Sequence, residues 1–174
     1  MLTALKNLPQ DAVFTTLKSP VGELFLIASK EGLHALLWEC DMKEKSCRDL
    51  FQNLKRDDKH ALLQKAISQL KEYFKGDRRN FDLLLAPHGT AFQMKAWREL
   101  SKIPYGETIS YAEQASRVGD SKKARAVGTA NSRNPISIVV PCHRVIAKSG
   151  ALSGFGGGVP TKKFLLELEN RISQ

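Results

Sequence analysis

The segment SYAEQASRVGDSKKARAVGTAN, residues 110–131, decides the fold of the second half of the chain. Ser110 and Glu113 match a capping box, in which the two side chains satisfy free backbone N–H groups, so a short helix should begin there. We expect this helix to run to about Val118 and to stop at Gly119. A second helix follows at once, and two short helices joined by a tight glycine-containing turn are typical of a helix-turn-helix.

The second helix of the pair is expected from Lys122 to Asn131, with Ser121 as its cap. It is basic at its start, yet its other side chains are mostly small. The small residues are Ala124, Ala126, Gly128 and Ala130. A helix that reads bases in the major groove usually carries long side chains. Small ones instead suit close approach to a backbone or to a narrow groove.

Beyond this pair, Asn134-Pro135 breaks the helix and the apolar run Ile136–Val140 has the composition of a buried strand. The run ends at PCHR, residues 141–144. A glycine-rich loop should then cover residues 150–158, and an amphipathic helix should run from Thr161 to about Arg171.

The first third of the chain has strand character. Apolar segments at residues 12–18, 23–29 and 32–38 are separated by turn sequences, which predicts an antiparallel meander. A helical stripe follows over residues 57–74, and residues 81–85 are a plausible last strand. The sequence of this part therefore indicates a small α/β domain.

The best domain boundary is the sequence APHG at residues 86–89, where composition shifts toward positive charge. Thr90 can cap a helix that runs to Leu100. We therefore expect an N-terminal α/β domain over residues 1–86 and a mostly helical C-terminal domain over residues 87–174, an α/β fold class overall.

Net positive charge is concentrated in the second half of the chain. The formal net charge of the 174 residues is +9. Residues 1–85 carry 14 Lys and Arg against 12 Asp and Glu, whereas residues 86–174 carry 13 against 6. A one-sided basic patch indicates a polyanion ligand such as a nucleic acid, although a solvated basic surface would have the same composition.

No apolar run is long enough to span a membrane, and the N-terminus lacks the pattern of an export signal. The three cysteines, Cys40, Cys47 and Cys142, form no disulfide-framework spacing, so we expect a reducing, cytoplasmic compartment. Together with His34 and His60, the first two could be imagined as zinc ligands. No Cys-x-x-Cys or His-x-x-x-His pair is present, so these residues are expected to bind no metal.

Cys142 is the best candidate for a reactive group. It follows the rigid Pro141 at the end of the expected strand and precedes His143, a possible base, and the cation Arg144. A buried structural cysteine with an incidental histidine remains an alternative. A Cys-His hydrolase is another, but it needs a third orienting group and an oxyanion hole, and it leaves the basic helix pair unexplained.

The stretch NPISIVVPCHRV, residues 134–145, resembles the active-site motif of the O6-alkylguanine-DNA alkyltransferases. Other parts of residues 90–170 resemble this family in order and spacing. They are TAFQ at 90–93 with Trp97, IPYG at 103–106, Ser110 with Tyr111, ARAVG at 124–128, and Leu165-Leu166 with Glu169. Residues 1–85 resemble the family in length and arrangement only. The resemblance implies a ribonuclease-H-like N-terminal domain and a winged-helix-like helix-turn-helix after it.

In this family the damaged nucleotide is flipped out of duplex DNA. The resemblance implies that Arg125 fills the vacated space while its helix enters the minor groove, which agrees with the small residues on that helix. The matching DNA-binding positions are Lys122, Lys123, Ala124, Arg125, Ala126, Gly128 and Asn131.

The resemblance also implies the chemistry. Cys142 takes the alkyl group from O6-alkylguanine, and also from O4-alkylthymine, as a thioether that water cannot release, so the protein is consumed. His143 acts as a water-linked base, and Glu169 orients it. Asn134 braces the loop before the cysteine, and Tyr111 gives a phenolic proton toward the departing base. Arg144 is expected to fix local structure, no cofactor is implied, and a monomer is expected.

The resemblance places Val145, Phe155 and Gly156 in the substrate pocket. Relatives have a tyrosine, often followed by a serine, where this chain has Phe155 and Gly156. The phenylalanine lacks a hydroxyl group and the glycine lacks bulk, which predicts a roomier, softer pocket that accepts alkyl groups larger than methyl. Alternatively, Phe155 refills the volume and leaves the selectivity unchanged.

A protein of a different class would bind the lesion without transfer, as a helix-turn-helix sensor or regulator. Alkyltransferase-like sensors lack the acceptor cysteine, whereas this chain has Cys142. No regulatory extension precedes residue 1 in the sequence given, which disfavours a dual regulator.

Overall fold

The structure, a computed structural model, describes Leu5 and residues 7–173, with the side chains of the last two of these left aside. Two compact units make up the chain, Met1–His88 and Gly89–Gln174. Of the helices described, none is long and apolar enough to cross a membrane.

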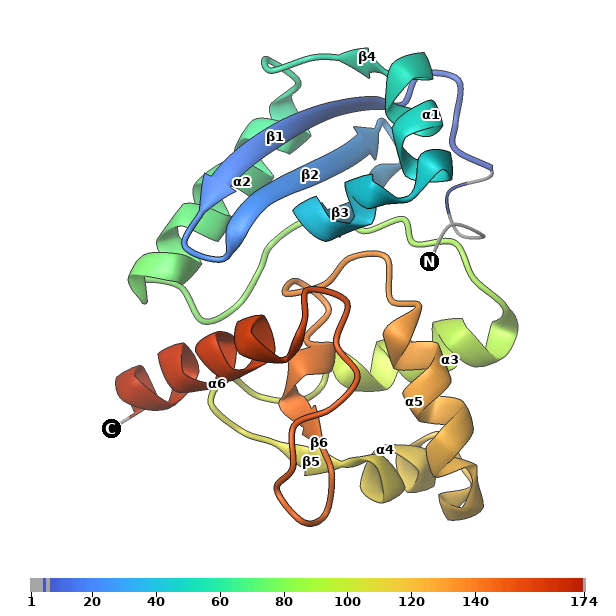
Figure 1. The fold of residues 1–174 in the computed structure, drawn as a ribbon, viewed down its shortest axis with the longest axis vertical. Helices are drawn as coiled ribbons and strands as arrows, with labels where there is room; N and C mark the ends of the chain where they lie inside the picture. The colour runs from blue at the N-terminus through green and yellow to red at the C-terminus, as the bar shows by residue number, and fades with distance from the viewer. Residues whose placement is uncertain (1–4, 6, 174) are drawn as a thin grey trace. The chain divides into compact units, whose positions relative to one another are not determined.

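The first unit is built on the expected meander, which Figure 1 shows as the blue strands. Strands β1 (Val13–Ser19), β2 (Gly22–Ser29) and β3 (Gly32–Trp38) pair antiparallel in sequence order. A short strand, β4 (Lys55–Arg56), pairs parallel to β1 and completes the order β3-β2-β1-β4. The sequence predicts the three long strands, but it contains no clear signal for the two-residue β4.

Three helical elements accompany this sheet: η2 (Glu39–Lys43), α1 (Lys45–Asn53) and α2 (Ala61–Lys75). The first two are missing from the sequence prediction. The signal that could have found α1 is a helical stripe that begins at Cys47, which is 2% exposed, and continues through partly buried apolar residues. These residues are Leu50, Phe51 and Leu54.

Helix α2 begins four residues later than the sequence predicts. Asp57 and Asp58 precede it as loop residues, because the carboxylate of Asp57 bonds to a neighbouring backbone N–H and that of Asp58 bonds to a side chain of β1. Asp57 accepts the backbone N–H of Lys59 at 2.9 Å, and Asp58 accepts the hydroxyl of Thr15 at 2.7 Å. Such side-chain bonds compete with helix formation. The helix ends as expected at Gly76, which has φ 89°.

The expected strand at residues 81–85 is wrong except at its end. A single bridge joins Leu85 to Leu33 of β3, with Leu33 N–H donating to the Leu84 carbonyl at 2.8 Å and Ala86 N–H to the Leu33 carbonyl at 2.9 Å. This close approach needs Gly32, where φ is 142° and a Cβ atom would lie 2.9 Å from the Leu84 carbonyl oxygen.

The second unit is mostly helical, as the sequence predicts. Its helices are α3 (Ala91–Leu100), α4 (Tyr111–Arg117), α5 (Ala124–Ser132) and α6 (Val159–Ser173). Helices α3, α4 and α5 pack around a small core, and Trp97 of α3 donates its indole N–H to the Ala130 carbonyl of α5 at 2.9 Å. The core residues are Ala96, Ala115, Val118, Val127 and Ala130.

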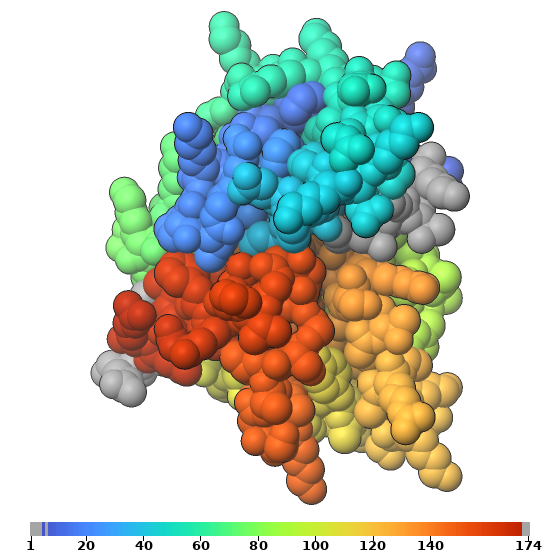
Figure 2. All heavy atoms as spheres, viewed as in Figure 1, coloured from blue at the N-terminus to red at the C-terminus, as the bar shows by residue number. Residues whose placement is uncertain are grey.

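Shorter elements connect these helices. They are β5 (Ile109–Ser110), η3 (Ser121–Lys123), η4 (Cys142–Arg144) and β6 (Val145–Ile146). β5 and β6 pair in parallel, so the segment after Cys142 lies beside the segment before Tyr111. In the space-filling view, the orange segment that follows β6 protrudes from this unit (Figure 2).

The helix-turn-helix is confirmed in α4 and α5, with two corrections at its caps. Ser110 accepts the backbone N–H of Glu113 at 3.1 Å, but the Glu113 carboxylate pairs with Arg117 at 2.7 Å and is used along the helix. The cap of the next turn is Asp120 and not Ser121, because its carboxylate accepts the Lys122 N–H at 3.0 Å. The turn η3 therefore precedes α5, which begins at Ala124.

The expected strand at Ile136–Val140 is wrong. The run is buried but folded into tight turns, and Ile138 is the one non-glycine residue with positive φ, 72°, in the part of the chain that the structure describes. Val139 N–H donates to the Ser137 carbonyl at 3.0 Å, which closes a strained three-residue turn around Ile138. Apolar composition indicates burial here, and it does not determine whether the backbone is extended.

Replacing Gly32 by alanine should destabilise the first unit by about 3 kcal/mol, because the new methyl group meets the Leu84 carbonyl and the backbone leaves the region that L-residues adopt. Urea denaturation of the two proteins measures the difference. The matched control is Gly150→Ala, where φ is 81° and nothing lies within 4 Å of the added Cβ. That variant should lose only about 1 kcal/mol. Equal losses in both variants would mean that the contact with Leu84 is unimportant.

Candidate active site

The turn before Cys142 is held together by one amide side chain. Asn134 donates its Nδ2 to the Val140 carbonyl at 2.8 Å, and its Oδ1 accepts the Ile136 N–H at 3.1 Å. Cys142 N–H then donates to the Val140 carbonyl at 2.8 Å. The residues between Asn134 and Cys142 therefore form a closed loop that fixes where the thiol emerges. The bracing role expected for Asn134 agrees with this geometry.

Cys142 begins the single turn η4 and is 6% exposed. Burial raises the pKa of its thiol, because a thiolate loses hydration in the interior. Hydrogen bonds that involve the side chains of Asn134 and Ser137 act against this increase, as does the positive charge of Lys162. The thiol is thus sequestered, and the groups around it favour the charged form.

His143 is fully buried beside Glu169 of α6, with 2.8 Å between Nε2 and Oε1. Burial lowers the pKa of the imidazole, although Glu169 acts to raise it. A neutral histidine that faces a carboxylate carries its proton on Nε2, since the carboxylate can only accept. Nδ1 is then unprotonated, and it has no hydrogen-bond partner among the described residues. This ring can accept a proton at Nδ1.

Glu169 is the charged centre of the site and is completely buried. Arg144 donates Nε to Oε2 at 2.9 Å and Nη2 to Oε1 at 3.0 Å, a paired geometry, and the Gly106 N–H donates to Oε2 at 3.0 Å. Burial alone would raise the pKa of this carboxyl, but the hydrogen bonds and charges of His143 and Arg144 lower it to about 2. Glu169 is therefore ionised at neutral pH.

Arg144 connects this centre to the loop after α3, because its Nη1 donates to the Ile103 carbonyl at 2.6 Å. The IPYG segment, residues 103–106, thereby contacts the site through Ile103 and Gly106. Arg144 is 6% exposed, and Nε, Nη1 and Nη2 of its guanidinium each donate one of these bonds. The structural role expected for Arg144 agrees with this arrangement.

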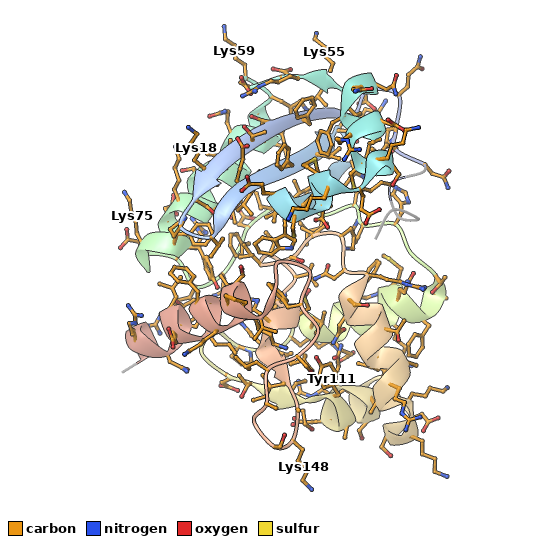
Figure 3. All side chains as sticks on the ribbon, in the orientation of Figure 1. Lys18, Lys55, Lys59, Lys75, Tyr111 and Lys148 are labelled. Atoms are coloured by element: carbon orange, nitrogen blue, oxygen red, sulfur yellow. The ribbon has the colours of Figure 1, made fainter. Side chains whose placement is uncertain are left out.

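A cavity of about 400 Å³ lies between α4, α5 and the loop after β6. Its lining residues are Tyr111, Ala124, Arg125, Gly128, Ser132, Ser153 and Gly154. Figure 3 shows Tyr111 inside this unit and Lys148 projecting outward from the loop after β6. Burial raises the pKa of the Tyr111 hydroxyl, and the nearby Cys142 adds to this effect, so the group is a proton donor at neutral pH.

The turn η3 and helix α5 present most of the expected contact residues outward. Arg125, Ala126, Lys122 and Lys123 are exposed, and Ala124 is half-buried. A Cβ atom on Gly128 would lie 3.7 Å from the Tyr111 ring, so a small residue keeps this face of the helix open.

Asn131 does not face outward with these residues, which corrects its expected place among the DNA contacts. It is 6% exposed, and its Nδ2 donates to Gln114 Oε1 at 2.7 Å while its Oδ1 accepts from Gln114 Nε2 at 3.1 Å. This paired amide bond joins α5 to α4. Sequence reasoning missed Gln114, since its helix position alone does not say what it faces.

The three expected pocket residues differ in how far they are buried. Val145 is completely buried next to η4, Phe155 is half-buried, and Gly156 is exposed. The ring of Phe155 meets His143 edge to face, with 6.4 Å between centroids. The glycine-rich loop thus contacts His143 through the aromatic ring of Phe155.

Sequence reasoning missed one buried charged group of the site, Lys162 of α6. Lys162 is 1% exposed. It lies on the same helical face as Leu165, three residues later, and Glu169, four residues after that. That spacing was the available signal, because a lysine on the apolar stripe of an amphipathic helix is unusual.

The histidines and cysteines of the first unit that were considered as zinc ligands lie in different environments. His34 is buried and bonded to Ser29 Oγ at 2.8 Å and to the Ala86 carbonyl at 2.9 Å, while Cys40 is exposed and Cys47 buried. Among the described residues, no group of three or more His, Cys, Asp or Glu side chains is placed to hold a metal ion.

His143→Ala and Glu169→Gln should each slow the alkylation of Cys142 by iodoacetamide, and the double variant should be little slower than the slower single variant. Groups that act as one unit give such non-additive losses. Second-order rate constants at neutral pH test this, with Glu167→Gln as the control, since Glu167 lies exposed on the same helix. Losses that multiply in the double variant would show that the two residues act separately.

Family models and individual relatives of this chain point to the same protein family. Residues 91–171 match the model described as 6-O-methylguanine DNA methyltransferase, DNA binding domain, and residues 12–87 match that of its ribonuclease-like domain. A methylated-DNA–protein-cysteine methyltransferase of Methanosarcina acetivorans is 42% identical over 156 residues, 90% of this chain and 97% of the relative.

Solved structures agree with this match. The crystal structure of Mycobacterium tuberculosis O6-methylguanine methyltransferase superposes with a TM-score of 0.84 at 41% identity, covering 94% of this chain and 95% of that one. A structure of the M. tuberculosis protein in complex with DNA gives a TM-score of 0.81 at 42% identity, with coverage of 91% and 93%. The expected α/β fold class, with a small sheet domain before a helical DNA-binding domain, is confirmed.

Proposed function

The chain belongs to the 6-O-methylguanine DNA methyltransferase family, and from this we infer that it repairs DNA by moving the O6-alkyl group of a damaged guanine onto Cys142. The observation that carries the assignment to Cys142 is its position. A buried thiol is followed directly in the chain by a neutral histidine with an unprotonated Nδ1, which is oriented by an ionised glutamate. This is the arrangement that activates a nucleophile.

The transfer step follows from these groups. The thiol proton leaves toward Nδ1 of His143 through a bridging water, and sulfur attacks the alkyl carbon. The carbon–O6 bond breaks, and its electron pair stays on the guanine. Tyr111 donates its hydroxyl hydrogen toward the departing base and offsets the negative charge that develops there. The product is a thioether, which water does not cleave, so each protein molecule acts once.

The target atom is buried in a duplex, so the nucleotide must be extruded before transfer, at a cost of a few kcal/mol for unstacking. We propose that α5 enters the minor groove and that Arg125 occupies the gap that the nucleotide leaves. The exposed Arg125 and the small residues Ala126 and Gly128 support close approach to DNA. Exposed Lys122 and Lys123 would contact phosphates.

Several finer features of the activity are part of the proposal. O4-alkylthymine presents a similar alkyl–oxygen bond, in the same groove of DNA as the O6-alkyl group of guanine, and is a second substrate. One monomer acts at one lesion. A reduced thiol at Cys142 is required, which supports our proposal that the protein acts in the reducing cytoplasm.

The glycine-rich loop determines which alkyl groups are accepted. Phe155 lies against His143, and Gly156 follows it with no side chain. We propose that this pair gives a pocket that accepts groups larger than methyl, because a glycine removes bulk at the position next to the aromatic ring.

One methyl group should be found on Cys142 after incubation with a duplex that contains a single O6-methylguanine. Intact mass and peptide mapping measure the amount and the position, and transfer should stop at one equivalent per protein. Cys142→Ser should accept nothing, whereas Cys40→Ser and Cys47→Ser should behave as the wild type. Several turnovers, or a methyl group on another cysteine, would contradict the assignment.

Arg125→Ala should slow repair of the duplex at least tenfold while it leaves the reaction with free O6-benzylguanine nearly unchanged, because only the duplex has a base to extrude. Single-turnover rates on both substrates test this. In the control Lys123→Ala, the main change should be a smaller salt dependence of DNA binding. If Arg125→Ala slows both substrates equally, the residue has no role in extrusion.

A further inference from the structure

Lys162 is a buried cation that the transfer step above does not use. Its side chain enters the second unit from α6 and is 1% exposed. Nζ donates to the Val145 carbonyl at 2.6 Å and to the Ser153 carbonyl at 3.3 Å, and it lies 5.8 Å from the centre of the Tyr111 ring. None of these partners carries a negative charge. A buried lysine is normally paired with a carboxylate, so this environment needs an explanation.

The three partners of Lys162 belong to three different segments around the reactive site. Val145 N–H donates to the Cys142 carbonyl and closes the turn η4, so the bond from Nζ continues a chain of contacts that starts at the nucleophile. Ser153 belongs to the glycine-rich loop, and Tyr111 begins α4. One ammonium group therefore joins the nucleophile turn, the loop and the phenol.

The buried charges of this unit give the reason for a cation here. Arg144 and Glu169 neutralise each other, and His143 is neutral because burial lowers its pKa. The positive charge of Lys162 remains, and the group that can balance it is the Cys142 sulfur. Among the described residues these five are the buried ionisable side chains of the unit, with half-buried Tyr111 facing them from α4.

We propose that Lys162 is a positioning residue that supplies the counter-charge for the Cys142 sulfur and holds the glycine-rich loop against the nucleophile turn. As the thiol proton leaves, negative charge develops on sulfur in a site without solvent, where a nearby cation acts strongly. The ammonium offsets this charge without touching the alkyl group. The inference deepens the proposed function and rests on Cys142 as the nucleophile.

Lys162 and Cys142 affect each other's pKa in the way expected of a cation beside a thiolate. Lys162 favours the thiolate of Cys142, and Cys142 in turn acts to raise the pKa of Lys162, which burial lowers. Without the cation, the thiolate would keep only neutral hydrogen-bond partners. The pH at which Cys142 becomes reactive should then rise, since the charged form is the one that loses stabilisation.

The test is the pH profile of Cys142 alkylation by iodoacetamide, followed by mass spectrometry on that cysteine. In Lys162→Met the midpoint should rise by at least one pH unit, with a rate at pH 7 at least tenfold lower than in the wild type. Above both midpoints the two rates should converge. The matched control is Lys163→Met, because Lys163 is the next residue of α6 and its side chain is 67% exposed. Its profile should equal that of the wild type.

Two further variants separate charge from structure. Lys162→Arg keeps the cation and should retain a midpoint within about half a unit of the wild type. Lys162→Ala should recover part of its lost rate when propylammonium chloride is added, and sodium chloride at the same concentration should not restore it.

An unchanged midpoint in folded Lys162→Met would overturn the proposal. So would a loss of rate that is the same at every pH, or an equal upward shift in Lys162→Arg and Lys162→Met. Iodoacetamide needs no DNA, so this test is independent of repair. A shifted midpoint together with no transfer from an O6-methylguanine duplex would leave the role of Lys162 intact and refute the proposed function instead.

Discussion

The buried carboxylate of Glu169 is the interaction on which the reactive site depends. Its two oxygens accept bonds from Arg144, His143 and the Gly106 backbone, so residues from α6, from η4 and from the loop after α3 meet at one charge. An ionised group without solvent is tolerated only where such partners are complete. The same bonds orient the imidazole and fix its tautomer. Removing this one charge would leave Arg144 buried without an anion and His143 without an orientation.

The nucleophile turn solves a different problem, the rigid presentation of a buried thiol. Asn134 closes the turn from inside, and the backbone around Ile138 adopts a conformation that β-branched residues rarely take. Strain of this kind persists where surrounding contacts determine the conformation, and it is common beside reactive groups. Helix α6 then meets the turn at two points of opposite charge, Glu169 near His143 and Lys162 near Val145. One amphipathic helix thus supplies both an orienting anion and a cation.

The helix pair and the reactive site are joined by short contacts. Strand β5 leads into Tyr111 and pairs with β6, which follows the cysteine turn. Gly128 of α5 faces the Tyr111 ring, and the Asn131–Gln114 amide pair links α5 to α4. The surface that we propose approaches DNA and the thiol are therefore parts of one packed unit. A shift in either helix would change the cavity between them.

The sequence by itself determined the local features. The three long strands of the first unit, the glycine that ends α2, the Thr90 cap of α3 and the helix-turn-helix were all readable, because turn residues, caps and hydrophobic periodicity act over a few residues. Cys142, His143 and Arg144 are adjacent in the chain, so their chemistry was visible as well. The family motif added Glu169, Asn134 and Tyr111, which no local pattern would have joined to the cysteine.

Tertiary structure decided what depends on partners far apart in the sequence. The run Ile136–Val140 looked like a strand because burial and extension have the same apolar composition, and the Asn134 bonds together with backbone bonds inside the run make it a turn. Asn131 looked like a surface residue until Gln114, 17 residues away, was placed beside it. The place of Lys162 on the apolar stripe of α6 indicated burial, but its partners could not be read locally, since its environment comes from Val145, Ser153 and Tyr111 together. Burial and charge balance are properties of packed segments, and a sequence fixes them only through the fold.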